Sequence, residues 1–165
     1  MSCRESGLTV VACSKNVIVF KDEVLSTDLS VSFNPSCIAL SKGIVAVGGQ
    51  DSKVHIFSLS GTKLSEEKTL PHTSPITGVA FSPNGEYLVA TDSGRKVVPY
   101  SVKDGYKTVA EKEWTFHTAK VNCVAWSPDS RHLATGGLDT NIIVWDLQRS
   151  GEHPVIIRVF MKFLK

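Results

Sequence analysis

The chain alternates between short apolar runs and short polar breaks along most of its length. The apolar runs are rich in β-branched and aromatic residues, and the breaks are rich in Gly, Pro, Asn and Asp, as in Ser82-Pro83-Asn84-Gly85. Runs of this kind predict β-strands joined by tight turns. No segment before the C-terminus has the 3.6-residue period of an amphipathic helix. One stretch predicts four consecutive strands, at 76–81, 87–91, 96–102 and 107–114.

These strands belong to a repeat with a period of 45 residues. Three pairs of features share that spacing: His72 and His117, Tyr100 and Trp145, and the turns that begin at Ser82 and Ser127. A third copy over 47–57 matches 135–145, and a partial copy covers 12–20. Four short strands per repeat of this length are typical of one blade of a β-propeller. We therefore predict an all-β fold of propeller blades.

The last repeat carries the signature of the WD-repeat family. The signature residues are Phe116-His117, Leu133-Ala134-Thr135-Gly136-Gly137, Asp139 and Val144-Trp145-Asp146. Family members usually begin with Gly-His, so Phe116 is a departure. The resemblance implies a structural tetrad, a hydrogen-bonded chain from Trp145 through Thr135 and His117 to Asp139. A chain of this kind supplies the partners that a buried indole N–H and a buried hydroxyl require.

The other repeats are degenerate at the same positions. In the middle repeat Tyr100 replaces the Trp, Gly94 replaces the Asp, and Pro99 enters the third strand. Proline removes a donor from the strand ladder and predicts a bulge or a locally open edge. In the upstream repeat Phe57 replaces the Trp, so no tetrad is expected there. We expect these blades to be held by apolar contact instead.

The repeats divide the chain into about three and a half blades, an incomplete propeller. The predicted parts are a partial blade (1–30), three blades (31–70, 71–115 and 116–158) and a divergent tail (159–165). Because about four to eight blades close a propeller, two blade ends should stay open. The chain is therefore expected to be a fragment or a shortened isoform of a longer protein. Self-association through the open ends would be another way to close a ring.

The order of details along the chain resembles one WD-repeat family, that of actin-interacting protein 1. The stretches that carry the resemblance are Val45-Ala46-Val47-Gly48-Gly49-Gln50-Asp51, Phe57-Ser58-Leu59-Ser60-Gly61-Thr62, Val102-Lys103-Asp104-Gly105-Tyr106, His117-Thr118-Ala119-Lys120-Val121, Ala125-Trp126-Ser127-Pro128-Asp129 and Gly136-Gly137-Leu138-Asp139. The resemblance implies two consecutive seven-bladed propellers, of which this chain matches the late part of the second. It also implies actin filaments and cofilin as partners, in the disassembly of cofilin-decorated filaments. No binding residue of the family carries over to a matched position here.

A generic WD-repeat adaptor for the assembly of protein complexes is the alternative function, and it is supported by the fold alone. On the rim that holds the tetrad histidine, Arg95, Lys96 and Lys120 are candidate partner-binding residues. The competing interpretation is that these side chains are simply solvated. At the C-terminus, a helix would place Ile156, Val159, Phe160, Phe163 and Leu164 on one face, as in a small amphipathic anchor. The alternative is a fourth strand near 154–158 that runs into a replaced or truncated tail at 159–165.

Charge and motifs exclude several other function classes. A net charge of +2 is too small for a nucleic-acid-binding domain. The four cysteines form no C-x-x-C pair, so neither a metal site nor a cofactor is predicted, and we expect buried, reduced thiols. No nucleotide-binding or hydrolase motif is present, so no catalytic residue is predicted and the chain is not expected to be an enzyme. Without a secretory signal or an apolar run of about 20 residues, we predict no membrane association and a cytoplasmic, cytoskeletal location.

Overall fold

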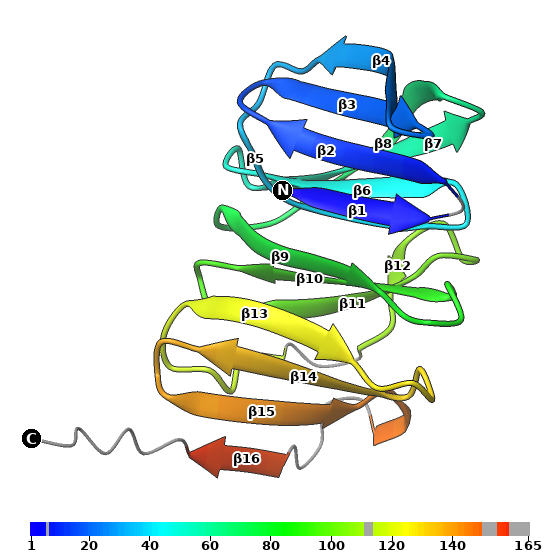
Figure 1. Cartoon of the computed structure of the whole chain (residues 1–165). Helices are drawn as coiled ribbons and strands as arrows, with labels where there is room; N and C mark the ends of the chain where they lie inside the picture. Colours follow the sequence, from blue (N-terminus) through cyan, green and yellow to red (C-terminus); the bar gives the residue numbers. More distant parts are fainter. Residues whose placement is uncertain (6, 111–113, 150–154, 159–165) are drawn as a thin grey trace, which may run out of the picture.

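The computed structural model describes residues 1–5, 7–110, 114–149 and 155–158. Four four-stranded antiparallel sheets follow one another along the chain, from the N-terminal sheet at the top of Figure 1 to the C-terminal sheet at the bottom. The first sheet contains β1 (Ser2–Glu5), β2 (Leu8–Cys13), β3 (Asn16–Lys21) and β4 (Val24–Ser30). The second contains β5 (Pro35–Ser41), β6 (Ile44–Gly49), β7 (Lys53–Ser60) and β8 (Lys63–Pro71). The third contains β9 (Ile76–Phe81), β10 (Tyr87–Asp92), β11 (Val97–Ser101) and β12 (Lys107–Thr108), and the fourth contains β13 (Val121–Trp126), β14 (His132–Gly137), β15 (Asn141–Asp146) and β16 (Val155–Arg158).

Each sheet is a meander in which strands consecutive in sequence are also neighbours in space. The first strand of each sheet packs against the first strand of the next, so β1, β5, β9 and β13 line the inner edge of the stack. This is the arrangement of propeller blades around an axis. The ring is not closed, so the prediction of an all-β, incomplete propeller is confirmed.

The N-terminal blade is more complete than the sequence predicts. The described residues of 1–30 form four strands rather than part of a blade, so the described part of the chain holds four blades where the sequence predicts about three and a half. The hairpins of this blade turn through residues with positive φ, namely Lys15 (61°), Asp22 (49°) and Glu23 (67°), with little Gly or Pro to mark them. This blade also lacks the connector histidine and the tryptophan of the repeat signature, which is why its outer strand escapes prediction.

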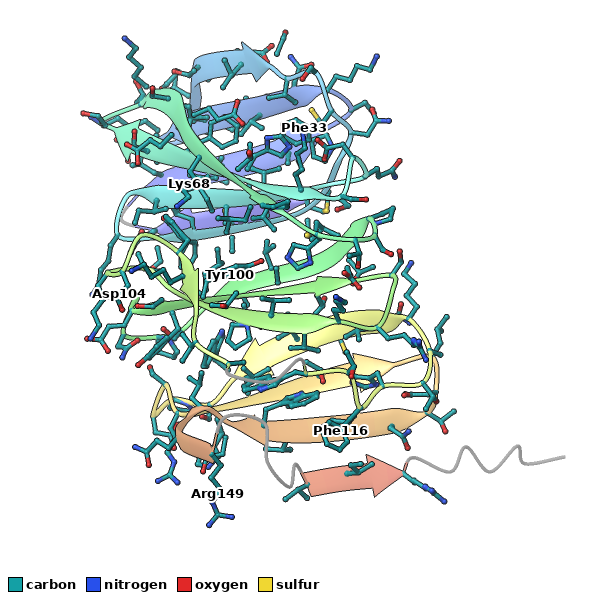
Figure 2. The ribbon with its side chains drawn as sticks, turned by 180° about the vertical axis from the view of Figure 1, so that it is seen from behind. Phe33, Lys68, Tyr100, Asp104, Phe116 and Arg149 are labelled. Carbon is teal, nitrogen blue, oxygen red and sulfur yellow. The ribbon has the colours of Figure 1, made fainter. Side chains whose placement is uncertain are left out.

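Three apolar layers hold the four blades together, one between each pair of adjacent sheets. Between the first and second sheets lie Val10, Ala12, Val17, Val19, Phe33, Val45, Val47, Phe57 and Leu64. Between the second and third lie Ala46, Val54, Ile56, Leu70, Ile76, Val79, Leu88, Ala90 and Tyr100, the last of which is labelled in Figure 2. Between the third and fourth lie Val89, Val97, Trp114, Val121, Leu133, Ile143 and Trp145. In the second sheet, Val45 and Val47 of β6 point to one layer and Ala46 points to the other, as the two-residue period of a strand requires.

A chain of hydrogen bonds also ties the four blades along one rim. The Lys42 backbone N–H donates to Glu5 Oε1 at 3.1 Å, and its Nζ donates to the Asn84 carbonyl at 2.5 Å. The Asn84 N–H in turn donates to Ser130 Oγ at 3.0 Å. These four residues lie at or beside the first hairpin turn of each blade, so the contacts fix the spacing of the blades at that rim.

The outer strand of the third blade is much shorter than the strand that the sequence predicts over 107–114, and it lies beside Pro99, where a locally open edge is expected. β12 is two residues long and pairs with β11 only at Tyr100 and Ser101. Beyond it, the Val109 N–H still donates to the Pro99 carbonyl, and the chain returns to β11 at an isolated bridge between Val97 and Trp114. A cavity of about 450 Å³ lies beside this edge. Its lining includes Pro99, Tyr100 and Trp114.

The predicted last strand is present as β16, which pairs with β15. The tail at 159–165 lies outside the described residues. No described helix is long and apolar enough to cross a membrane. Among residues 1–5, 7–110, 114–149 and 155–158, no cluster of three His, Cys, Asp or Glu side chains is placed to hold a metal ion.

Candidate partner-binding face

One face of the stack, here called the connector face, carries the second turn of every blade and the connectors between blades. Its turns are 14–15, 50–52, 93–96 and 138–140, and its connectors are 31–34, 72–75 and 115–120. Backbone hydrogen bonds tie the incoming connector to the turn in three blades: Gln50 N to Asn34 O (2.9 Å), Ser93 N to Pro75 O (2.9 Å) and Leu138 N to Lys120 O (2.8 Å). Loops at one end of a rigid stack are where binding residues are most often found.

In the last blade the structure brings the four predicted tetrad residues into one hydrogen-bonded chain. The Trp145 Nε1–H donates to Thr135 Oγ1 at 2.8 Å, and Thr135 Oγ1 lies 2.8 Å from His117 Nε2. His117 Nδ1 lies 2.9 Å from Asp139 Oδ2. Trp145, Thr135 and His117 are each no more than 1% exposed, so this chain links the connector, β14, the turn and β15 inside the blade.

The direction of donation in this chain follows from its ends. The indole N–H can only donate, so the Thr135 oxygen accepts it and turns its own hydrogen toward His117 Nε2. The proton of the neutral imidazole then sits on Nδ1 and is donated to Asp139. Burial raises the pKa of Asp139, but the backbone N–H groups of Thr118 and Asn141 and the His117 ring outweigh it, and the pKa lies below its usual value. The carboxylate therefore stays ionised at the connector face.

Phe116, at the position where the family usually has Gly, packs its ring edge-on against Trp145, with ring centroids 5.9 Å apart (Figure 2). Trp114 stacks on the same indole at 4.8 Å with an interplanar angle of 2°. Among the residues described, the Trp114 indole N–H is the buried side-chain group that lacks a hydrogen-bond partner. Three aromatic side chains thus anchor the connector 115–120 on the last blade.

The middle blade holds a polar chain where the sequence predicts apolar packing. Tyr100 Oη lies 3.0 Å from His72 Nε2, and His72 Nδ1 lies 3.3 Å from Asp92 Oδ2. Asp92 comes from the end of β10 and accepts the Lys96 N–H at 3.0 Å, so it takes the role that the sequence assigns to the position of Gly94. The phenol reaches the histidine directly, without an intervening threonine. Burial, with a smaller contribution from Asp92, raises the pKa of Tyr100 to about 12.

In the upstream blade a buried histidine lies between two carboxylates. This arrangement also corrects the expectation that the blade is held by apolar contact alone. His55 of β7 lies 2.7 Å from Glu66 Oε1 through Nδ1 and 3.1 Å from Asp51 Oδ2 through Nε2. Its ring stacks on Phe33 of the connector at a centroid distance of 3.6 Å. In three successive blades, therefore, a histidine joins a strand or connector to a carboxylate at or beside the second turn.

The structure distributes the three candidate cations over the connector face. Arg95 lies exposed in the turn after β10, with a φ of 76°. Lys96 lines the cavity beside Pro99. Lys120 is exposed and lines a separate hollow of about 490 Å³ together with Gln50 and Asn122. Lys96 and Lys120 therefore line two different hollows, although the turn at 93–96 and the connector at 115–120 both belong to the connector face.

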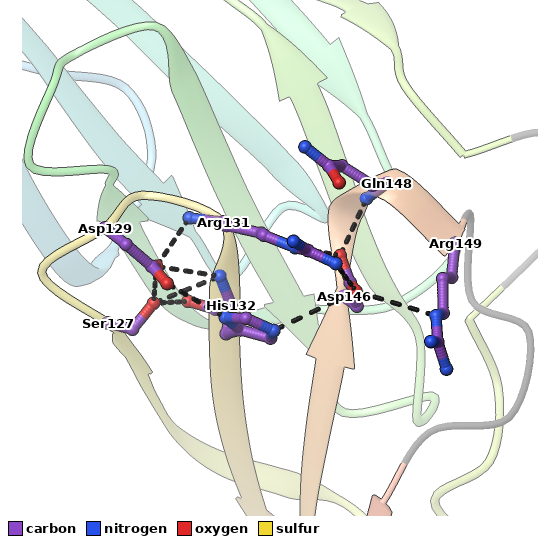
Figure 3. A network of polar contacts seen from close by, with 7 residues as sticks. All are labelled: Ser127, Asp129, Arg131, His132, Asp146, Gln148 and Arg149. Atoms are coloured by element: carbon purple, nitrogen blue, oxygen red, sulfur yellow. Dashed lines mark hydrogen bonds and ion pairs between the residues drawn. The ribbon is translucent and has the colours of Figure 1, made fainter.

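The opposite face carries a polar network that sequence reasoning missed (Figure 3). Asp146 accepts two hydrogen bonds from Arg131, at 3.0 Å from Nε and 2.6 Å from Nη2, and a third from the Gln148 N–H. Arg131 is the first cause of the lowered pKa of Asp146, about 2. Asp129 accepts the Ser127 hydroxyl and the Arg131 N–H, which places its pKa well below the usual range.

Comparison with known proteins shows which sequences this chain resembles. The model described as "WD domain, G-beta repeat" matches residues 64–98 and 109–146. Actin-interacting protein 1 of Caenorhabditis elegans is 51% identical over 156 residues, and that of Drosophila melanogaster is 42% identical over 155 residues. Both alignments cover 93% of this chain.

The chain belongs to the actin-interacting protein 1 family of WD-repeat proteins.

Its similarity to the family extends to vertebrate members, such as WD repeat-containing protein 1-B of Xenopus laevis, with 40% identity over 146 residues, 86% of this chain. The chain spans about a quarter of the length of these curated relatives: 25% of each of the two actin-interacting proteins and 24% of the Xenopus protein. The first repeat match begins in β8 of one blade and ends in β11 of the next. The sequence repeat of the family is therefore offset from the structural blade by one strand.

Proposed function

We propose that this chain is a non-enzymatic scaffold that binds actin filaments, and that it contributes to the disassembly of filaments decorated with cofilin, in the cytoplasm. The observation that carries the proposal is the 51% identity, over nearly the whole chain, to a protein named for its interaction with actin. We further propose that the chain corresponds to the late part of a second propeller. The blade geometry supports a scaffold, since its buried polar groups are used to hold connectors in place.

We propose the connector face as the surface that meets the filament. Its turns and connectors are held by the buried histidine chains, so a partner would meet a preformed surface and lose little conformational entropy on binding. Arg95 and Lys120 extend from it as exposed cations. An acidic surface on the partner would be complementary to them, and the contact would weaken as salt is added.

Pelleting with cofilin-decorated actin filaments tests both the function and the face. The purified chain should co-sediment, and the double variant R95A/K120A should co-sediment about 10-fold more weakly, a loss typical of a few rim contacts. Lys103 lies exposed on the opposite face, in the turn between β11 and β12, so K103A is the matched control and should bind like the unchanged chain. Equal binding by all three proteins would refute the proposed face. Absence of pelleting by the folded, unchanged chain would refute actin binding and leave the generic adaptor.

A further inference from the structure

His55 of β7 has a carboxylate at each of its two ring nitrogens. Nδ1 lies 2.7 Å from Glu66 Oε1, and Nε2 lies 3.1 Å from Asp51 Oδ2. An ionised carboxylate can only accept a hydrogen bond, so both ring nitrogens must donate. A neutral imidazole carries a single N–H and cannot make both contacts. The geometry therefore calls for the doubly protonated imidazolium.

The buried histidines of the next two blades do not have this requirement. In the third blade, His72 faces one carboxylate and the Tyr100 hydroxyl. In the fourth, His117 faces one carboxylate and the Thr135 hydroxyl. A hydroxyl can donate to a bare ring nitrogen, so a neutral imidazole satisfies both of these sites. Of these three buried side chains, His55 is the one that needs both protons.

The ring of Phe33 supports the charged state of this histidine. It lies on the imidazole of His55 with a centroid distance of 3.6 Å and an interplanar angle of 3°. Two neutral aromatic rings prefer an offset or edge-on arrangement, whereas a cation over a ring face is attracted by the ring quadrupole. The stack and the two carboxylates together offset the cost of burying a charge on a side chain that is 8% exposed.

Asp51 and Glu66 are the charged groups that the surrounding elements turn toward this ring. The connector 31–34 and β6, which lie against β7, contain no charged residue. Lys53, two residues earlier on the same face of β7, is exposed to solvent. Lys68 of β8 is used elsewhere, because its Nζ donates to a backbone carbonyl of the third blade.

We propose that the His55 imidazolium is a pH-sensitive clamp on the connector face. It joins β8 to the turn 50–52 through the two carboxylates, and it holds the connector through Phe33. Within the described part of the chain, neither Asp51 nor Glu66 has another hydrogen-bond or ion-pair partner for its carboxylate. When His55 releases its second proton to water, the carboxylate beside the bare nitrogen loses its donor. That carboxylate then turns into solvent, which both side chains already reach, with 33% and 46% exposure.

NMR of the imidazole ring nitrogens in the folded full chain tests the charge. E66Q replaces one carboxylate by an amide, which can donate to a bare nitrogen. In this variant His55 should bind its second proton at least about 10-fold more weakly than in the unchanged chain. E67Q is the matched control, because it removes the same charge from the next residue of β8, where that charge acts on Tyr106 of the third blade. It should leave proton binding by His55 nearly unchanged.

Hydrogen exchange measures whether the clamp holds the connector. The Gln50 N–H ties the turn to the connector by donating to the Asn34 carbonyl at 2.9 Å. The Leu138 N–H makes the corresponding contact in the fourth blade, whose histidine needs only one proton. As His55 loses its second proton, the protection of the Gln50 N–H relative to that of Leu138 should fall about 10-fold. A loss of this size is expected when one hydrogen bond to a charged group is broken.

Either of two results would overturn the proposal. The first is equal proton binding by His55 in the unchanged chain and in E66Q. The second is protection of the Gln50 N–H that follows that of Leu138 through the whole titration. D51N removes the other carboxylate and should also weaken proton binding, so it takes the place of E66Q if that variant does not fold.

Discussion

Replacing Thr135 by valine removes one hydroxyl from the buried chain of the last blade while it keeps the volume and the β-branching of the side chain. Two groups lose their partner at once, the Trp145 indole N–H and His117 Nε2. Leaving a buried polar group unpaired costs about 1–3 kcal/mol. Because the site is closed to water, we expect T135V to lower the free energy of unfolding by about 2–4 kcal/mol.

Urea unfolding followed by circular dichroism and by tryptophan fluorescence measures this loss. The protein concentration is held constant across variants, so that a change in association does not enter the comparison. Thr69 lies exposed in β8, and T69V makes the same chemical change without removing a buried partner. This control should unfold within about 0.5 kcal/mol of the unchanged chain. If T135V costs no more than T69V, the hydrogen-bonded chain does not stabilise the blade.

A double-mutant cycle with W145F shows whether the chain acts as a unit. Once the indole N–H is gone, T135V leaves only His117 Nε2 without its partner, so its additional cost should fall by about 1–2 kcal/mol. Strict additivity of the two substitutions would mean that the residues contribute through packing alone.

Three further predictions concern Tyr100, Asp146 and the two half-buried cysteines. Y100F should destabilise the chain by about 1 kcal/mol, because the buried histidine of the middle blade loses its hydroxyl partner, whereas the half-buried Y106F should not; urea unfolding of both compares them. For Asp146, whose pKa is lowered from its ordinary value of 3.8 to about 2, the stabilising effect is complete above about pH 4 and is lost as the pH falls toward 2. The stability difference between the unchanged chain and D146N should therefore shrink over that interval, and a constant difference would contradict the ion pair. Burial raises the thiol pKa of the half-buried Cys3 and Cys37 to about 11, so both should react with a thiol reagent at pH 8 more slowly than the exposed Cys13, and equal rates for the three thiols would contradict that shift.

The parts of the structure that could be predicted from the sequence are those that depend on local residue patterns. The strands and the 45-residue repeat follow from alternating composition and turn residues, and the residues His117 and Trp145 stand at signature positions. Pro99 also acts as expected, because the loss of one backbone donor is a property of the residue itself.

The parts that escaped prediction depend on partners distant in sequence. Asp92 substitutes for a missing turn carboxylate at one ring nitrogen of His72, and Tyr100 is long enough to reach the other; no repeat signature encodes either contact. Glu66 reaches His55 from a neighbouring strand.

The most direct test of the proposed function measures filament disassembly over time, with and without cofilin, by the release of actin into the supernatant. With cofilin present, adding the folded chain should speed the release, and without cofilin it should have no effect. An unchanged rate at a saturating concentration of folded chain would contradict the proposed contribution to disassembly, even if the chain binds the filament.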